Sequence, residues 1–181
     1  MPLTGEHVQL TAFEKEDLQT IIQWHQDARF LRQFDAAIAK PKTMQEMEKW
    51  YEEAASSNDG FLFAIRTKET NTLIGYMELD SILWNQRNAW VSIAIGDDAY
   101  RGKGYGTEAM QLLMAFAFEE CNLHRLQLTV FENNERALRM YERLGFTREG
   151  AFREYVYRDD RPVDMVLYGL LKREWKEGSA S

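Results

Sequence analysis

Three strand-like segments follow one another between residues 61 and 95, and this run most restricts the folds open to the chain. The segments read "FLFAIRT" (61–67), "TLIGYMELDSIL" (72–83) and "AWVSIAI" (89–95), and all are rich in large apolar residues. The connections "KETN" and "WNQRN" are short and polar, so the three strands are predicted to be antiparallel neighbours. Such a run is typical of an α+β fold and excludes a doubly wound parallel sheet.

The segments on either side alternate between helical and strand periodicity. The expected elements, in chain order, are a strand at 7–13, helices at 14–31 and 43–55, the three strands, a helix at 104–120, a strand at 125–131, a helix at 134–144 and a strand pair that turns at "RDDRP". Thr43 and Glu46 predict a capping box, Asn134 is an expected N-cap, and Gly145 is an expected helix stop. The predicted order is β-α-α-β-β-β-α-β-α-β-β, a mixed, mostly antiparallel sheet flanked by helices.

Length and composition fit one compact domain. The chain has 181 residues, of which 45% are hydrophobic, so we expect a single domain over residues 1–175 and a disordered tail, "KEGSAS", over 176–181. The single cysteine, Cys121, rules out an intramolecular disulfide and favours the cytoplasm. The N-terminal residues lack a signal-peptide pattern, and no apolar run reaches the roughly 18 residues of a membrane span, so no membrane association is expected.

Charge and histidine spacing exclude further classes. The net charge of −7 gives no basic footprint for nucleic acid and favours a cationic partner. The three histidines, His7, His25 and His124, are too far apart in the sequence to suggest a metal site, so we expect none.

The segment "YRGKGYGTEAM" (100–110) places three glycines at alternate positions before an apolar helix. A dinucleotide fingerprint fails because Thr107 stands at its third glycine position, and a Walker A loop fails because Gly102-Lys103-Gly104 lacks the Ser or Thr. A kinase loop lies between two strands, whereas this loop opens a helix. Glycines at a helix N-terminus present unpaired backbone N–H groups, so the loop suits a phosphate or pyrophosphate, although a plain glycine turn fits the same pattern.

Two motifs together carry a resemblance to a known family. Arg101-Gly102-Lys103-Gly104-Tyr105-Gly106 resembles the Q/R-x-x-G-x-G/A acetyl-CoA loop of the GNAT superfamily of N-acetyltransferases. Downstream, "NNERALRMYERLGF" is similar to that superfamily's Asn-x-x-Ala-x-x-x-Tyr-x-x-x-Gly-Phe segment, with Asn134, Ala137, Tyr141, Gly145 and Phe146 in register. Residues 60–170 resemble the RimJ/RimL-type branch, which includes spermidine N-acetyltransferases, whereas the first 60 residues match only in outline.

The resemblance implies a GNAT-like fold with acetyl-CoA as cosubstrate. It implies that backbone amides of residues 101–107 bind the pyrophosphate and that residues 93–95 pair with the pantetheine arm as another strand would. The implied cofactor contacts are Ile93, Ala94, Ile95, Arg101, Gly102, Lys103, Gly104, Tyr105, Gly106, Thr107, Asn134 and Ala137. Spacing alone more often indicates a core tyrosine at position 141, whereas the resemblance implies that Tyr141 acts as general acid at the thioester sulfur.

The general base is a separate hypothesis. A primary amine with a pKa of about 10.4 is almost fully protonated at pH 7, so a carboxylate or water chain is needed to remove its proton. Glu78 in the strand "GYMELDSI" is the candidate, Asp80 on the same strand face is a poorer one, and a solvated carboxylate at position 78 fits the pattern equally.

The acceptor is the least specified part of the prediction. An aromatic and acidic set, Trp24, Asp27, Phe30, Phe34 and Asp35, suits a polyamine through cation–π contact and ion pairing, and equally suits a helix that packs on the sheet. We expect an N-acetyltransferase acting by direct attack of a small polyamine-like amine on the thioester. The alternatives are a protein N-terminal amine as acceptor and a catalytically silent acyl-CoA-binding module. The oligomeric state stays open, although a C-terminal strand pair is a frequent dimer edge in such folds.

Overall fold

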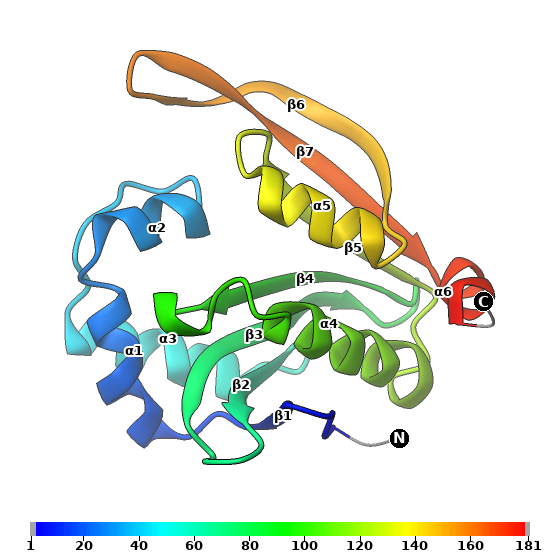
Figure 1. Cartoon of the computed structure of the whole chain (residues 1–181), viewed down its shortest axis with the longest axis horizontal. Helices are drawn as coiled ribbons and strands as arrows, with labels where there is room; N and C mark the ends of the chain where they lie inside the picture. Colours follow the sequence, from blue (N-terminus) through cyan, green and yellow to red (C-terminus); the bar gives the residue numbers. More distant parts are fainter. Residues whose placement is uncertain (1–2, 180–181) are drawn as a thin grey trace.

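The computed structural model describes residues 3–179, and the side chains of residues 3–175. Its centre is a seven-stranded sheet with the order β1-β2-β3-β4-β5-β7-β6 (Figure 1). The strands are β1 (Val8–Ala12), β2 (Phe61–Thr67), β3 (Leu73–Leu83), β4 (Asn88–Ile95), β5 (Arg125–Phe131), β6 (Thr147–Arg158) and β7 (Arg161–Leu171). Neighbouring strands are antiparallel except β4 and β5, which run parallel. The predicted mixed, mostly antiparallel sheet is confirmed.

Helices cover both faces of this sheet. The α-helices of the described part are α1 (Leu18–Trp24), α2 (Ala28–Phe34), α3 (Met44–Ser56), α4 (Tyr105–Ala115), α5 (Glu135–Arg143) and α6 (Lys172–Ser179). A π-helical turn, Phe116–Glu120, extends α4 to the length expected from the sequence. The predicted caps are confirmed, because Thr43 and Glu46 form a capping box and Asn134 Oδ1 accepts from Ala137 N at 3.2 Å. Gly145 follows α5 with a φ of 93°.

The helix predicted over 14–31 is wrong in one respect, because it is broken into α1 and α2. α1 ends at Trp24, and Asp27 begins α2 as its N-cap, accepting a hydrogen bond from Arg29 N at 2.8 Å. An aspartate that bonds a nearby backbone amide competes with the continuous helical ladder, which explains the break.

The C-terminal segment also differs from the prediction. α6 includes residues 176–179, which the sequence assigned to a disordered tail, and residues 180 and 181 lie outside the described residues. Two contacts start this helix: Glu174 Oε2 accepts from Leu171 N at 2.9 Å, and the Trp175 ring lies 5.2 Å from that of Phe118. The helix therefore begins on the core, directly after β7.

The two faces of the sheet carry different helices. On one face, alternate residues of β3, β4 and β5, such as Met77, Val91 and Leu128, pack with α4 and α5 in the main core. On the other face, Tyr76 and Ala94 pack with α1, α2 and α3 in a second core. Because the loop expected to bind the acetyl donor opens α4, we call the face covered by α4 and α5 the donor face. The opposite face, covered by α1–α3, is called the acceptor face.

β4 and β5 separate soon after they begin. Their pairing is limited to Asn88–Trp90 opposite Arg125–Gln127, and beyond these residues the two strands diverge (Figure 1). The later part of β4 therefore pairs with β3 on one edge only. This separation leaves an opening between the two halves of the sheet, with α4 and α5 beginning beside it.

Candidate functional site

The glycine loop forms a nest of backbone donors at the start of α4. Gly102 and Gly104 have φ values of 74° and 83°, a conformation that other residues adopt only with strain. Gly104 is the N-cap, and its carbonyl accepts from Glu108 N at 3.0 Å, so the helical ladder begins only there. The amides of Tyr105, Gly106 and Thr107 precede that first bond and have no acceptor within the helix. The loop thus offers an anion both unpaired N–H groups and the positive end of the helix dipole.

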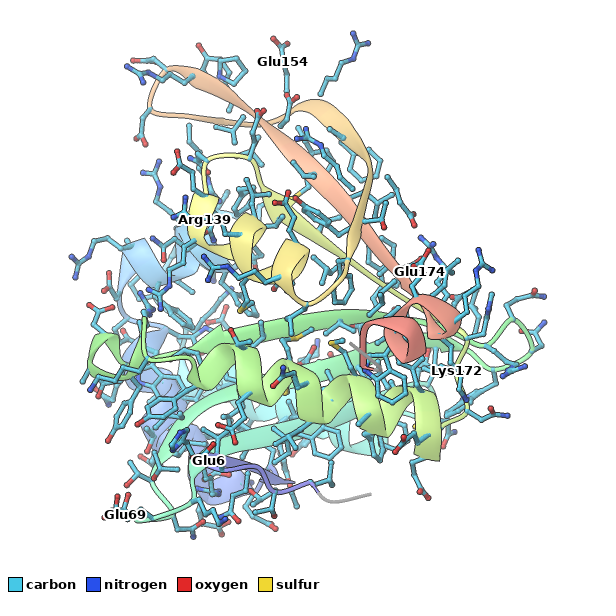
Figure 2. The ribbon with its side chains drawn as sticks, turned by 45° about the vertical axis from the view of Figure 1, so that its right-hand side comes forward. Glu6, Glu69, Arg139, Glu154, Lys172 and Glu174 are labelled. Carbon is cyan, nitrogen blue, oxygen red and sulfur yellow. The ribbon has the colours of Figure 1, made fainter. Side chains whose placement is uncertain are left out.

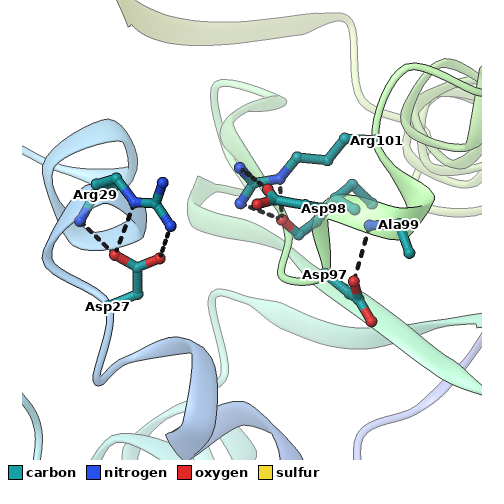
Figure 3. Close-up of polar contacts among 7 residues, drawn as sticks. Asp27, Arg29, Asp97, Asp98, Ala99 and Arg101 are labelled. Atoms are coloured by element: carbon teal, nitrogen blue, oxygen red, sulfur yellow. Dashed lines mark hydrogen bonds and ion pairs between the residues drawn. The ribbon is translucent and has the colours of Figure 1, made fainter.

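Arg101 anchors this loop to the end of β4. Its Nε and Nη2 donate to Ile95 O at 3.1 and 2.9 Å, and its Nη1 lies 2.8 Å from Asp98 Oδ1 (Figure 3). Its backbone N–H donates to Asp98 O at 3.2 Å. Arg101 therefore differs from the other predicted loop contacts, because both its amide and its guanidinium are occupied in shaping the loop.

The peptide groups of the three predicted β4 contacts are not equivalent. Gly96 N donates to Ile74 O in β3 at 3.0 Å, and successive peptide groups of a strand point to alternate edges. By that alternation Ile93 and Ile95 turn their peptide groups to the opening, whereas Ala94 pairs with Tyr76 of β3. Ala94 is thereby removed from the candidate backbone contacts, and the carbonyl of Ile95 is already taken by Arg101.

Tyr141 lies on α5, on the donor face. Its ring packs against Phe146 and Tyr168, and the residue is only 8% exposed. Burial raises the pKa of the phenol well above its usual value. In the described part of the chain, only one side-chain N or O atom is both fully buried and without a hydrogen-bond partner, and that atom is Nδ1 of His25, not the Tyr141 hydroxyl. The Tyr141 hydroxyl also lacks a hydrogen-bond partner among these residues, and it is therefore not fully buried.

Glu78 lies on the acceptor face, in the middle of β3. Trp50 Nε1 of α3 donates to its Oε1 at 3.1 Å. Burial, and secondarily the charge of Asp80, raises the pKa of this carboxyl from 4.5 to about 6. A carboxylate with a pKa just below neutrality is ionised at pH 7 and remains a competent proton acceptor.

Comparison with known proteins places this arrangement in a family. Residues 7–147 match the family model described as an acetyltransferase (GNAT) domain. The chain belongs to the GNAT acetyltransferase family.

The names of several relatives of this GNAT acetyltransferase refer to different acceptors. Spermidine N(1)-acetyltransferase of Escherichia coli K12 is 31% identical over 148 residues, which cover 81% of this chain and 76% of that protein. The putative ribosomal N-acetyltransferase YdaF of Bacillus subtilis is 35% identical over 105 residues, 58% of this chain and 57% of that protein. The crystal structure of a Vibrio cholerae spermidine N-acetyltransferase with CoA and spermine has a TM-score of 0.84 at 26% identity, covering 93% of this chain and 98% of that one.

The aromatic and acidic set near α2 is occupied in packing. Phe30 and Phe34 stack at 5.9 Å between ring centroids, and Phe34 lies 5.8 Å from the ring of Tyr76. Asp27 bonds Arg29, and Asp35 accepts from Ala37 N at 2.7 Å. Of the two interpretations of this set, the structure supports helix packing on the sheet.

Sequence reasoning missed Arg136, which lies in the first turn of α5. A Cβ placed on Gly102 would meet Arg136 Nη2 at 3.5 Å, so this guanidinium borders the loop. No ion pair is recorded for it among the described residues, unlike Arg139, which bonds Glu135 at 3.3 Å on the exposed side of α5 (Figure 2). Its place two residues after Asn134 was the available signal, because that puts it at the helix end expected beside the loop.

A cleft of about 920 Å³ opens between α2, the first turn of α5 and the β6–β7 hairpin. Phe131, Val156 and Val163 form its apolar floor. Phe131 follows Val130 of the main core in β5, and neighbouring strand residues point to opposite faces, so this floor belongs to the acceptor face.

Two other kinds of feature were not found in the part of the chain that the structure describes. No three His, Cys, Asp or Glu side chains gather there in a way that could hold a metal ion. None of the described helices combines the length and the apolar character of a membrane-spanning segment.

Proposed function

We propose that this protein transfers the acetyl group of acetyl-CoA to a primary amine by direct attack. The observation that carries the proposal is the convergence of the amide nest at Gly102–Thr107 with the unpaired edge of β4. A pyrophosphate bound in the nest places its pantetheine arm beside the peptide group of Ile93 and the N–H of Ile95, as an added strand would lie. The thioester then sits in the opening between β4 and β5.

The two catalytic candidates approach this opening from opposite faces. The amine enters from the acceptor face and loses its proton to the Glu78 carboxylate, directly or through water, and its nitrogen then attacks the thioester carbonyl. The nitrogen, now bonded to the acyl carbon, gives up a second proton to water, the C–S bond breaks, and the sulfur leaves as a thiolate. The Tyr141 hydroxyl donates a hydrogen bond to that sulfur from the donor face. Because burial raises the pKa of Tyr141, hydrogen bonding stabilises the thiolate more readily than complete proton transfer.

A covalent acetyl-enzyme is not part of the proposal. Cys121 follows the π-helical turn after α4, far along the chain from the glycine loop. Burial and the charge of Glu120 raise the pKa of its thiol to about 11, so the thiol stays protonated and weakly nucleophilic at neutral pH. The amine is therefore the attacking group in a ternary complex.

The comparisons support two kinds of primary amine as the acceptor. The spermidine N-acetyltransferase relatives and the net charge of −7 support a polyamine, whereas the ribosomal N-acetyltransferase relative supports a protein N-terminus. Both acceptors present the same reacting group.

The test is release of free CoA thiol from acetyl-CoA in the presence of a panel of amines. We expect release with at least one class, and Tyr141→Phe should lower kcat by about 10- to 100-fold, in the range of one transition-state hydrogen bond, with little change in KM for acetyl-CoA. Arg139→Ala is the matched control. Tight CoA binding without thiol release for any amine would instead identify a silent acyl-CoA-binding module, and full kcat in Tyr141→Phe would remove the tyrosine from the mechanism.

A further inference from the structure

The cleft on the acceptor face carries a charge opposite to that of the whole protein. Five arginines and two carboxylates line it, a surplus of three positive charges on a chain whose net charge is −7. The arginines come from three separate elements: Arg29 and Arg32 from α2, Arg136 from α5, and Arg158 and Arg161 from the hairpin. A polyamine would have to enter this field with its own positive charges, which like-charge repulsion opposes.

Three of these arginines have partners that hold the cleft in shape. Arg32 Nη2 bonds Asp159 Oδ2 at 2.5 Å, which ties α2 to the hairpin turn. Arg158 donates to the carbonyl of Arg32 and to those of Asp35 and Ala37 at 2.9 and 3.1 Å. It also lies over the Phe131 ring at 5.5 Å. Arg29 bonds the carboxylate of Asp27 beside it, at 3.3 Å.

Arg161 is different, because no ion pair or hydrogen bond of its side chain is recorded among the described residues. It lies directly across the strand pair from Arg158, and two residues further in the same register Val156 faces Val163. All four side chains line the cleft, so they project from one face of the hairpin. Like charges directly opposite each other destabilise a strand pair, and an anion bound in the cleft would offset that cost.

The two unpaired cations serve different halves of the cleft. Arg136 borders Gly102 of the donor loop, so its guanidinium lies close to the expected pyrophosphate. Arg161 stands on the hairpin, across the apolar floor formed by Val156 and Val163 and on the acceptor face. A guanidinium that is free, exposed and set above an apolar floor suits a carboxylate attached to a short organic chain.

We propose, resting on the acetyl-transfer function above, that the acceptor is an amine whose own molecule carries a carboxylate, and that Arg161 binds this carboxylate. The carboxylate is held at the hairpin while the amine reaches the opening between β4 and β5. Free amino acids and peptides with acidic residues near the N-terminus share this chemistry. Spermidine and other polycations lack it and are poor acceptors.

The experiment compares acceptors that differ only in charge. The initial rates of CoA release are measured for glutamate and its diamide, for an Ala-Asp-Glu peptide and its Ala-Asn-Gln counterpart, both amidated at the C-terminus, and for spermidine. We expect kcat/KM to be roughly 10- to 100-fold higher for the acid of the preferred pair than for its amide, in line with the contribution of a charged hydrogen bond. The amino-acid and peptide arms identify which source supplies the carboxylate. A higher value for spermidine than for both acids, or equal values within both pairs, would overturn the proposal.

Variants separate this role from donor binding. Arg161→Gln should raise KM for the acid acceptor by about tenfold or more and leave kcat, the amide acceptor and KM for acetyl-CoA unchanged. Arg161→Lys should recover part of the loss, and Arg139→Gln, on the exposed side of α5, should change nothing. An increase in KM for acetyl-CoA in Arg161→Gln would assign the arginine to the donor and contradict the proposal.

Binding calorimetry with the CoA complex gives a readout that does not depend on turnover. Tighter binding of the acid than of its amide, lost in Arg161→Gln, supports the cleft assignment even when no acetyl transfer occurs, and that combination would refute only the catalytic function. Equal binding of acid and amide would refute the cleft assignment itself.

Discussion

Glu78→Gln gives a quantitative test of the environment of the proposed base. Burial and the charge of Asp80 raise the pKa of Glu78 from 4.5 to about 6. In the unfolded chain the carboxyl releases its proton near the lower value, so between pH 4.5 and 6 the folded protein binds more protons than the unfolded one. The free energy of unfolding therefore falls as the pH rises through this window. At about 1.4 kcal/mol per pKa step, the ionised carboxylate costs the fold about 2 kcal/mol above pH 6.

A glutamine at position 78 does not titrate, but it keeps the shape of the side chain. Its Oε1 can still accept the hydrogen bond from Trp50 Nε1, which is 3.1 Å long in the wild type. We expect the difference in unfolding free energy, variant minus wild type, to increase by about 2 kcal/mol between pH 4 and pH 7. Urea denaturation at a series of pH values measures this difference, and titrations common to both proteins cancel. Glu53→Gln, at an exposed carboxylate of α3, is the control. A difference that stays flat with pH would show that Glu78 is hydrated, and the physical reason for assigning it as the base would be lost.

The same substitution changes the pH profile of the reaction. With a pKa of about 6, roughly nine-tenths of Glu78 is ionised at pH 7 and about one-tenth at pH 5. We expect kcat/KM of the wild type to fall by nearly tenfold over this range from the base alone, and Glu78→Gln to lack this limb. An unshifted profile in the variant would remove Glu78 from the mechanism.

Two further predictions concern other parts of the site. Arg101→Ala removes the bonds to Ile95 O and Asp98, so KM for acetyl-CoA should rise several-fold with kcat nearly unchanged; steady-state kinetics check this, and a lowered kcat at unchanged KM would contradict it. Burial, with the charge of Lys42 secondarily, lowers the pKa of His25 from 6.5 to about 4. The free energy of unfolding should therefore fall by about 2 to 3 kcal/mol as the pH drops from 6.5 to 4, and His25→Gln should lack this fall in a pH series of denaturation curves.

Much of the fold could be predicted because local chemistry determines it. The three central strands, the strand 125–131 and the helix caps at Thr43 and Asn134 follow from periodicity and from side chains that bond the nearest amide. The break between α1 and α2 also has a local cause, but its signal is a single aspartate, Asp27, within a long stretch of helical periodicity that by itself predicts one continuous helix.

The acceptor cleft could not be predicted because it belongs to no single segment. Arg32, Arg136 and Arg161 are about 130 residues apart at the extremes, and only the return of the hairpin over α2 brings them together. The net charge of −7 predicts a cationic partner, whereas the cleft itself carries a surplus of positive charge. The two differ because the net charge averages over the whole chain, while these arginines are gathered in one place. Similarly, the resemblance indicated the stretch Ile93–Ile95, but only the hydrogen bond from Gly96 N to Ile74 O shows, by alternation along the strand, that the peptide groups of Ala94 point to β3.

The contact between α2 and the hairpin has a consequence for the proposed acceptor cleft. Arg158 and the Arg32–Asp159 pair fasten the hairpin to α2, and the Phe34 ring of α2 rests on Tyr76 of β3. Two walls of the cleft are therefore tied to each other and, through α2, to the sheet. In the proposed mechanism an acceptor binds between walls that are already in place, so little of its binding free energy is spent on ordering the protein.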